Sequence, residues 1–286
     1  MDLLHWTASP PVLRRPVLLV ALEGFVDAGV VASTAAMFLR HRWRSEPVAT
    51  FDREALLDYR ARRPTVVVDS GRLRRLDWPE IELLTAAVDG PHDAALLVGP
   101  EPDMRWEGFA AAAADAAARL GAESVVTLGA YPAAAPHTRE TRIVQAGNAL
   151  AADHVEGAEP VEGYTGPIGA GAALQLRFAD AGIPAVGLWA EVPHYLTGSP
   201  YPAGALALVQ LVAGLLETDV DTAELEAAAR LHREQVDEAV ADHAEAQEMI
   251  RALEQHADSG RQDVDLPSGD DLAAEIERFL RTQQEG

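Results

Sequence analysis

Short apolar runs alternate with helical patterns along most of this chain, and this alternation constrains the fold more than any other feature. The runs are rich in Val and Leu and lack polar alternation, which is typical of strands buried on both faces. They are Val17–Leu22, Pro47–Phe51, Thr65–Val68, Ala94–Val98, Val125–Leu128, Ile143–Ala146 and Ala185–Trp189. Helical patterns separate several of them, at Ala28–Arg40, Trp106–Leu120, Ala170–Ala181 and Tyr201–Glu217. The sequence therefore predicts an α/β chain with a three-layer α/β/α architecture and a mostly parallel sheet.

Two segments depart from this alternation. Ser70–Ala87 contains a glycine turn and a Trp-Pro break, which predict hairpins at a sheet edge. Asp221–His256 has no Pro or Gly and predicts one long helix, whose weak apolar seam should pack on its own domain or on a short partner helix. After two glycine-containing breaks, a last helix is expected around 272–280. We therefore expect a core domain at 1–218 and an acidic helical hairpin extension at 219–286.

The charged residues narrow the function classes. The chain has no cysteine, and all 23 of its basic residues are arginine, which excludes thiol nucleophiles, disulfides, a P-loop lysine and a Schiff-base lysine. The formal net charge is −22, and residues 219–286 hold 19 acidic residues against 6 arginines. Such a surface repels nucleic acid and anionic membranes, so neither is expected as a partner. No long apolar run or basic leader is evident, which favours a cytoplasmic location.

The first candidate for a site is ALEGFVDAG, at 21–29, between a predicted strand and a predicted helix. It lacks the glycine spacing of dinucleotide and phosphate loops. Asp27 is placed to cap the helix, and Glu23 at the strand end could be a ligand or a general base. The alternative is a turn that only sets the fold.

Two further candidates follow predicted strands. In GPEPDMRW, at 99–106, Arg105 could bind a carboxylate or phosphate, or could form an internal bridge to the nearby acids. His137 and Arg139 lie in one Pro-His loop, and Glu191 and His194 lie in another. Together with Glu140, these two loops could form a His/carboxylate cluster for acid–base work. The alternative is that both histidines bond loop backbones. The spacing supports no metal site.

A glycine-rich segment, Gly163–Gly171, precedes the helix at Ala170–Ala181 and contains Tyr164. Its glycines allow a ligand to approach the backbone closely, so Tyr164 is a candidate for ligand binding. They equally suit a tight turn beneath a helix.

The ordered set of these motifs resembles the proteasome assembly chaperone 2 family, in its actinobacterial branch. The motifs are ALEGFVDAG, DYRARRP at 58–64, LDWP at 76–79, GPEPDMRW, PHTR at 136–139, YTGPIG at 164–169 and WAEVPHY at 189–195. The resemblance implies a phosphorylase/hydrolase-like fold, a homo-oligomer such as a trimer, and proteasome subunits or another protein as partners. Eukaryotic and archaeal members help proteasome α-rings to assemble. Some bacterial members carry an ATP-grasp label, but this chain lacks the lysines and the glycine-rich loop for it, so no cofactor is expected.

Two functions remain open at this point. The favoured one is a non-enzymatic binding or assembly protein that acts through protein–protein contacts. The alternative is a small-molecule hydrolase or phosphorylase acting on an anionic substrate. In that case Glu23, Arg105, His137, Arg139 and His194 would line one cleft at the strand ends, with the arginines on the anion and a histidine or Glu23 moving the proton.

Overall fold

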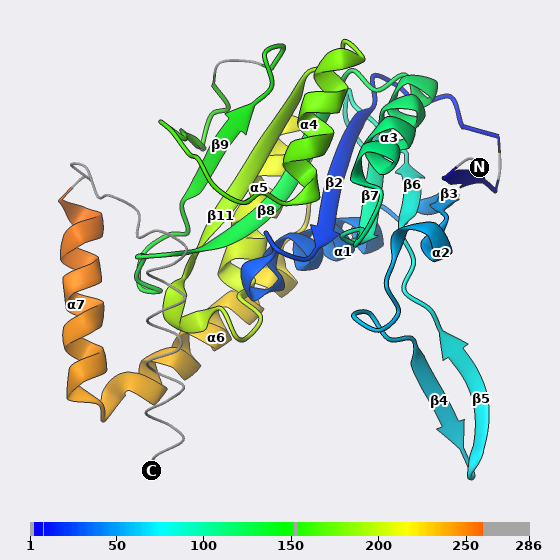
Figure 1. Cartoon of the computed structure of the whole chain (residues 1–286). Helices are drawn as coiled ribbons and strands as arrows, with labels where there is room; N and C mark the ends of the chain where they lie inside the picture. The colour runs from blue at the N-terminus through cyan, green and yellow to red at the C-terminus, as the bar shows by residue number, and fades with distance from the viewer. Residues whose placement is uncertain (1–2, 8, 152–153, 260–286) are drawn as a thin grey trace.

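A nine-stranded sheet forms the centre of the protein in the computed structural model, which describes residues 3–7, 9–151 and 154–259 (Figure 1). The strand order is β1-β3-β6-β7-β2-β8-β11-β9-β10. In that order the strands are β1 (Leu4–Trp6), β3 (Glu46–Phe51), β6 (Glu82–Ala86), β7 (Ala94–Pro100), β2 (Val17–Glu23), β8 (Ser124–Ala133), β11 (Ala185–Pro193), β9 (Ile143–Gly147) and β10 (Glu159–Pro160). The four central strands, from β7 to β11, run parallel, and antiparallel pairs flank them on both sides. The predicted α/β/α class is confirmed.

Helices cover both faces of this sheet. α1 (Val31–Arg42) and α5 (Pro202–Leu215) pack on one face, and α3 (Trp106–Leu120) and α4 (Ala170–Asp180) pack on the other, where the short α2 (Arg53–Leu56) joins them. β2 explains why the apolar runs show no polar alternation. Its Leu19 faces the α1–α5 layer and its Leu18 faces the α3–α4 layer, and each is 1 % exposed. A strand covered twice needs apolar side chains at every position.

One predicted strand does not belong to the sheet. β4 (Thr65–Asp69) and β5 (Arg72–Asp77) form a separate two-stranded hairpin that extends away from the body of the molecule (Figure 1). The expectation of a buried strand at Thr65–Val68 is therefore wrong. Ser70 and Gly71 both have positive φ, of 51° and 74°, as a two-residue hairpin turn requires.

The placement predicted for Ser70–Ala87 is also only half right. Its first part, β5, is a hairpin strand but lies off the main sheet. Its second part, β6, lies inside the main sheet between β3 and β7, antiparallel to both. Four of its five residues are buried, so it is a core strand and not an edge strand.

The long helix expected over Asp221–His256 is two helices, α6 (Ala223–Ala241) and α7 (Ala244–Asp258). The break falls at Asp242 and His243, and His243 has an extended backbone with φ −115° and ψ 95°. The side chain of Gln247 donates to the carbonyl of Ala241 and so satisfies an acceptor at the end of α6. The inward seam of α6 packs on α5 and buries Leu225, which agrees with the prediction that it contacts its own domain. The last predicted helix lies outside the described residues.

Candidate functional site

The two Pro-His loops lie side by side, as the sequence predicted. β8 and β11 are parallel neighbours whose register pairs Ala133 with Pro193, so both strands deliver their following loops to the same edge of the sheet. His194 begins the short helix η2 (His194–Leu196), and the ring of Tyr195 contacts both histidine rings edge-on. The ring centroids are 5.8 Å apart for His137 and Tyr195, and 5.4 Å apart for His194 and Tyr195.

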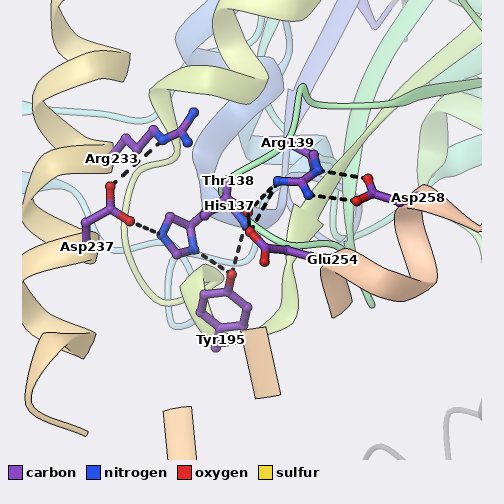
Figure 2. A network of polar contacts seen from close by, with 8 residues as sticks. All are labelled: His137, Thr138, Arg139, Tyr195, Arg233, Asp237, Glu254 and Asp258. Carbon is purple, nitrogen blue, oxygen red and sulfur yellow. Dashed lines mark hydrogen bonds and ion pairs between the residues drawn. The ribbon is translucent and has the colours of Figure 1, made fainter. Parts of the chain in front are cut away.

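His137 connects the β8 loop to α6 (Figure 2). Its Nδ1 lies 2.7 Å from the Tyr195 hydroxyl, and its Nε2 lies 3.0 Å from Oδ1 of Asp237. Its backbone N–H also donates to the Tyr195 hydroxyl at 2.9 Å. The side chain is 2 % exposed. Both ring nitrogens are thus engaged within the protein.

The hydrogen bonds around His137 link both of its ring nitrogens and the Tyr195 hydroxyl into one chain. Burial raises the pKa of Tyr195 to about 12, so its hydroxyl keeps a proton at neutral pH. That hydroxyl accepts from the backbone N–H and can donate to Nδ1, while Nε2–H donates to Asp237. Each of these groups thus has a partner within the protein.

Thr138 and Arg139 extend the same contact to α7 (Figure 2). Arg139 donates to both carboxylate oxygens of Asp258, from Nε at 2.9 Å and from an outer guanidinium nitrogen at 2.8 Å. Its other outer nitrogen lies 3.2 Å from Oε1 of Glu254, to which the Thr138 hydroxyl also donates. PHTR therefore holds α6 and α7 against the sheet edge through polar contacts.

Glu191 lies on β11 and not in the Pro-His cluster. It is 2 % exposed, accepts a hydrogen bond from the Tyr131 hydroxyl at 3.1 Å, and lies 3.9 Å from the guanidinium of Arg142. Tyr131 stands directly opposite it in the register of β8 and β11. The buried carboxylate thus has a cationic neighbour, as buried charges usually do.

Glu101 is the site residue whose role the sequence did not reveal. Its carboxylate accepts from the backbone N–H of Ala170, the first residue of α4, at 2.5 Å and from that of Phe25 at 3.2 Å. It therefore joins two motifs, ALEGFVDAG and GPEPDMRW, to the helix that follows YTGPIG, at the positive end of that helix. A bound phosphate would need this position, and the protein's own carboxylate occupies it.

The side chain of Glu101 lies so close to Gly24 that no larger residue fits at that position. A Cβ on Gly24 would lie 2.6 Å from Oε2 of Glu101 and 2.7 Å from its Cβ. The glycine of ALEGFVDAG is thus required by an internal carboxylate. The signal that sequence reasoning could have used is the pairing of a Gly-rich turn with a glutamate after the next strand of the sheet.

Asp27 caps α1 as predicted. Its Oδ1 accepts from the backbone N–H of Ala32 at 2.7 Å, and its Oδ2 accepts from the Ser33 hydroxyl at 2.6 Å. Burial raises the pKa of Asp27, against the opposing effect of these hydrogen bonds. The second half of ALEGFVDAG is thus a capped turn.

The remaining candidates lie apart from the His137 network. Glu23 ends β2, is exposed, and faces an open groove of about 600 Å³ whose other lining residues include Arg62 and Arg63. Arg105 precedes α3 with a left-handed φ of 59° and is exposed. The acid beside it, Asp103, forms an ion pair with Arg62 at 3.6 Å.

Tyr164 is 61 % exposed, and its hydroxyl donates to the carbonyl of Pro167 within its own loop at 2.7 Å. Among the residues that the structure describes, no group of three or more His, Cys, Asp or Glu is arranged to hold a metal ion. No helix in that part of the chain combines the length and hydrophobicity needed to cross a membrane.

The fold and this edge of the sheet define an α/β/α protein whose strand-end loops hold its own C-terminal helices. The chain belongs to the PAC2 family, whose model matches residues 21–240. No curated protein matches the chain.

Three solved structures illustrate the similarity. A protein of unknown function from Corynebacterium glutamicum is 32 % identical, with a TM-score of 0.84 over 90 % of this chain and 97 % of that one. A Mycobacterium tuberculosis protein of unknown function is 35 % identical, with a TM-score of 0.81 over 90 % and 91 % of the two chains. A proteasome-assembly chaperone homologue from Mycobacterium tuberculosis is 33 % identical, with a TM-score of 0.75 over 82 % and 99 %.

Proposed function

We propose that this protein is a non-enzymatic assembly factor that acts through protein–protein contacts, with proteasome α-subunits as its partner. The observation that carries the proposal is that two candidate site residues, His137 and Arg139, hold the protein's own C-terminal helices. His137 and Arg139 bond to α6 and α7, and Glu101 fills the N-terminal end of α4. In these positions His137 and Arg139 serve to attach the two C-terminal helices to the body of the protein.

The surface supports a binding role. The described part of the C-terminal extension, 223–258, carries ten acidic residues against three arginines on two helices that bury few side chains. An acidic surface of this kind accelerates encounter with a basic partner and excludes acidic ones. The similarity to a proteasome-assembly chaperone homologue suggests which partner to test first.

The test is direct binding to purified actinobacterial proteasome α-subunits, followed by size-exclusion chromatography and native electrophoresis. We expect the full-length protein to form a complex with free α-subunits and to speed their assembly into rings. The double variant Glu245→Arg/Glu248→Arg, on the exposed face of α7, should weaken that complex by about tenfold, because it reverses two charges on the acidic surface of the C-terminal extension.

The matched control is Glu156→Arg/Glu162→Arg, which changes the net charge equally at two exposed positions on either side of β10. It should bind as the wild type does. Absence of any complex with α-subunits at concentrations of about 100 μM would overturn the proposed partner. Equal weakening by both variants would overturn the role of α7.

A further inference from the structure

An open groove at the carboxyl edge of the sheet lies outside the His137 network. It has a volume of about 600 Å³ and is bounded by the ends of β2 and β7, by α1 and by the chain segment 61–65. Its lining residues on α1, which helical spacing places on one face, are Ser33, Ala36, Met37 and Arg40. Open α/β sheets bind small molecules at the carboxyl ends of their strands, and sites of this volume are common.

Two charged pairs in the lining are complete within the protein. Arg40 on α1 donates to Glu82 on β6 at 2.7 Å, and Glu80 accepts from Arg53 at 2.6 Å. An arginine and a carboxylate at these distances largely neutralise each other. These pairs therefore make part of the wall polar without leaving it charged.

One carboxylate and one guanidinium in the same groove are not used in this way. Among the residues that the structure describes, Glu23 and Arg63 form an ion pair neither with each other nor with a third residue. Both side chains are exposed. Arg62 also lines the groove, and its Nε lies 3.6 Å from Oδ1 of Asp103 and has no hydrogen-bond partner. The groove thus offers a ligand both a negative and a positive group.

The backbone fixes the positions from which these charges project. Glu23 stands opposite Pro100 in the register of β2 and β7, and its carbonyl accepts from the N–H of Glu101 at 2.9 Å. In the segment that leads to Arg63, the N–H of Arg62 donates to the carbonyl of Asp58 at 2.9 Å. Charges on fixed elements can bind a ligand with little loss of backbone freedom.

The surroundings of Glu23 favour a cation there. Burial is the main cause of the raised pKa of Asp27, and the negative charge of the nearby Glu23 raises it further. Two neighbouring carboxylates that repel each other attract a positive group. Glu23 is therefore the end of the groove suited to an ammonium group, and the paired arginines 62 and 63 are suited to a carboxylate.

The uncharged part of the lining is chiefly apolar. It includes Met37, which is 52 % exposed, together with Ala36, Ala61, Pro79 and Pro100. An aliphatic group that covered Met37 would gain free energy by leaving water. A complementary ligand therefore combines an ammonium group, a carboxylate and an aliphatic side chain.

We propose that this groove binds a zwitterionic ligand of the amino-acid class, either a free α-amino acid or a short peptide with both termini free. The ammonium group binds at Glu23, the carboxylate binds at Arg63 and Arg62, and an aliphatic side chain lies on Met37. The inference goes beyond the proposed function, because it assigns a small-molecule site to a protein proposed to act through protein–protein contacts.

The test is isothermal titration calorimetry on the purified full-length protein at low ionic strength, with leucine, leucyl-leucine and leucyl-leucyl-leucine as probes. Each added residue lengthens the probe by at most about 3.3–3.6 Å, so the tightest binder distinguishes a free amino acid from a peptide. We expect at least one probe to bind with a dissociation constant of about 1 mM or below. Its N-acetylated form and its C-terminal amide should each bind about fivefold more weakly, because each lacks one charge.

Two variants assign the ends of the ligand. In Glu23→Gln the free probe should lose its advantage over the acetylated probe and keep its advantage over the amide. Arg63→Gln should show the reverse pattern. Both positions are exposed, so the variants should keep the wild-type far-UV circular dichroism. Arg177→Gln, at an exposed position of α4 on the other face of the sheet, should bind every probe as the wild type does.

Three results would overturn the proposal. The first is the absence of binding by all three probes at about 10 mM. The second is equal binding of free and blocked probes by the wild type. The third is equal weakening of every probe in Glu23→Gln and in Arg63→Gln, since the two charges would then not recognise the two ends of the ligand. No proteasome subunit takes part in these measurements, so this proposal and the proposed function fail separately.

Discussion

At the scale of single residues, Glu101 does the most to hold the strand-end loops in place. It is 8 % exposed and serves two backbone donors on different elements. Glu101→Ala would leave the N–H groups of Phe25 and Ala170 without their acceptor, and we expect a loss of about 2–3 kcal/mol in the free energy of unfolding. Urea denaturation followed by circular dichroism measures it.

Glu101→Gln is the matched comparison. Its single amide oxygen can accept one of the two hydrogen bonds, and it is isosteric with the native side chain. We expect it to lose about half as much stability as the alanine variant. An alanine variant as stable as the wild type would contradict the bridging role of the carboxylate.

Asp93 makes the stability of the folded protein increase with pH in the acidic range. Burial opposes ionisation of Asp93, but hydrogen bonds from the side chain and backbone of Arg14 and from Val88 outweigh it and lower the pKa below the ordinary 3.8. The folded state therefore binds this proton more weakly than the unfolded state does. The contribution of ionised Asp93 to the free energy of unfolding is complete above about pH 4. It is lost as the pH falls through the lowered pKa of this residue.

We accordingly expect Asp93→Asn to be less stable than the wild type at pH 7 by about 1–3 kcal/mol. The difference should narrow as the pH falls below about 4, because the wild type then loses the same contribution. Urea titrations at pH 7, 5 and 3 measure this. Asp180→Asn, in an exposed pair at the end of α4, should show no comparable pH-dependent difference.

At the scale of elements, α7 is held to the body chiefly by polar contacts. In α7 only Ile250 is buried, and Arg139 provides two of the helix's ion pairs to the β8 loop. Elements with few buried apolar contacts open at low free energy. Arg139→Ala should therefore speed amide hydrogen exchange in 244–258 about fivefold while leaving α5 unchanged.

Arg177→Ala provides the comparison for α7. Arg177 pairs with Asp180 on its own helix, so its loss removes an arginine without releasing an element. Exchange in α7 should stay at the wild-type rate in that variant. Faster exchange across the whole protein in Arg139→Ala would contradict local release and would indicate general destabilisation.

Sequence patterns predicted where strands and helices form better than they predicted which of them are buried. Val17–Leu22 and Thr65–Val68 are both short Val-rich runs, yet one lies at the centre of the sheet and the other is exposed throughout. Periodicity reports the strand and not what covers it. In the C-terminal region, the break at Asp242 carries no Pro or Gly, so helix propensity alone could not predict it.

For the candidate site, too, the sequence predicted local elements but not the contacts between distant segments. Strand alternation correctly brought the two Pro-His loops together, because parallel neighbours end at one edge of the sheet. It could not predict that α6 and α7, about a hundred residues later in the sequence, would bond to His137 and Arg139. It also could not predict that Glu101 would turn inward to α4. Such long-range polar contacts depend on tertiary packing, which no local spacing encodes.

At the scale of the whole molecule, the residues that form the stable core are distinct from those of the exposed β4–β5 hairpin. The two apolar clusters that hold the sheet between its helix layers include none of the residues of β4 or β5. The hairpin leaves the body as an arm, with its strands paired only to each other (Figure 1). An element that contributes so little to the core is retained for a reason other than folding.

Replacing 65–77 by a short Gly-Ser linker tests this separation. The linker joins two segments that the Tyr59–Trp78 contact already holds near each other, so loop closure adds little cost. We expect the free energy of unfolding to stay within about 1 kcal/mol of the wild type. The measured urea m-value should fall slightly, because less surface becomes exposed on unfolding. A large drop in stability would mean that the hairpin supports the core.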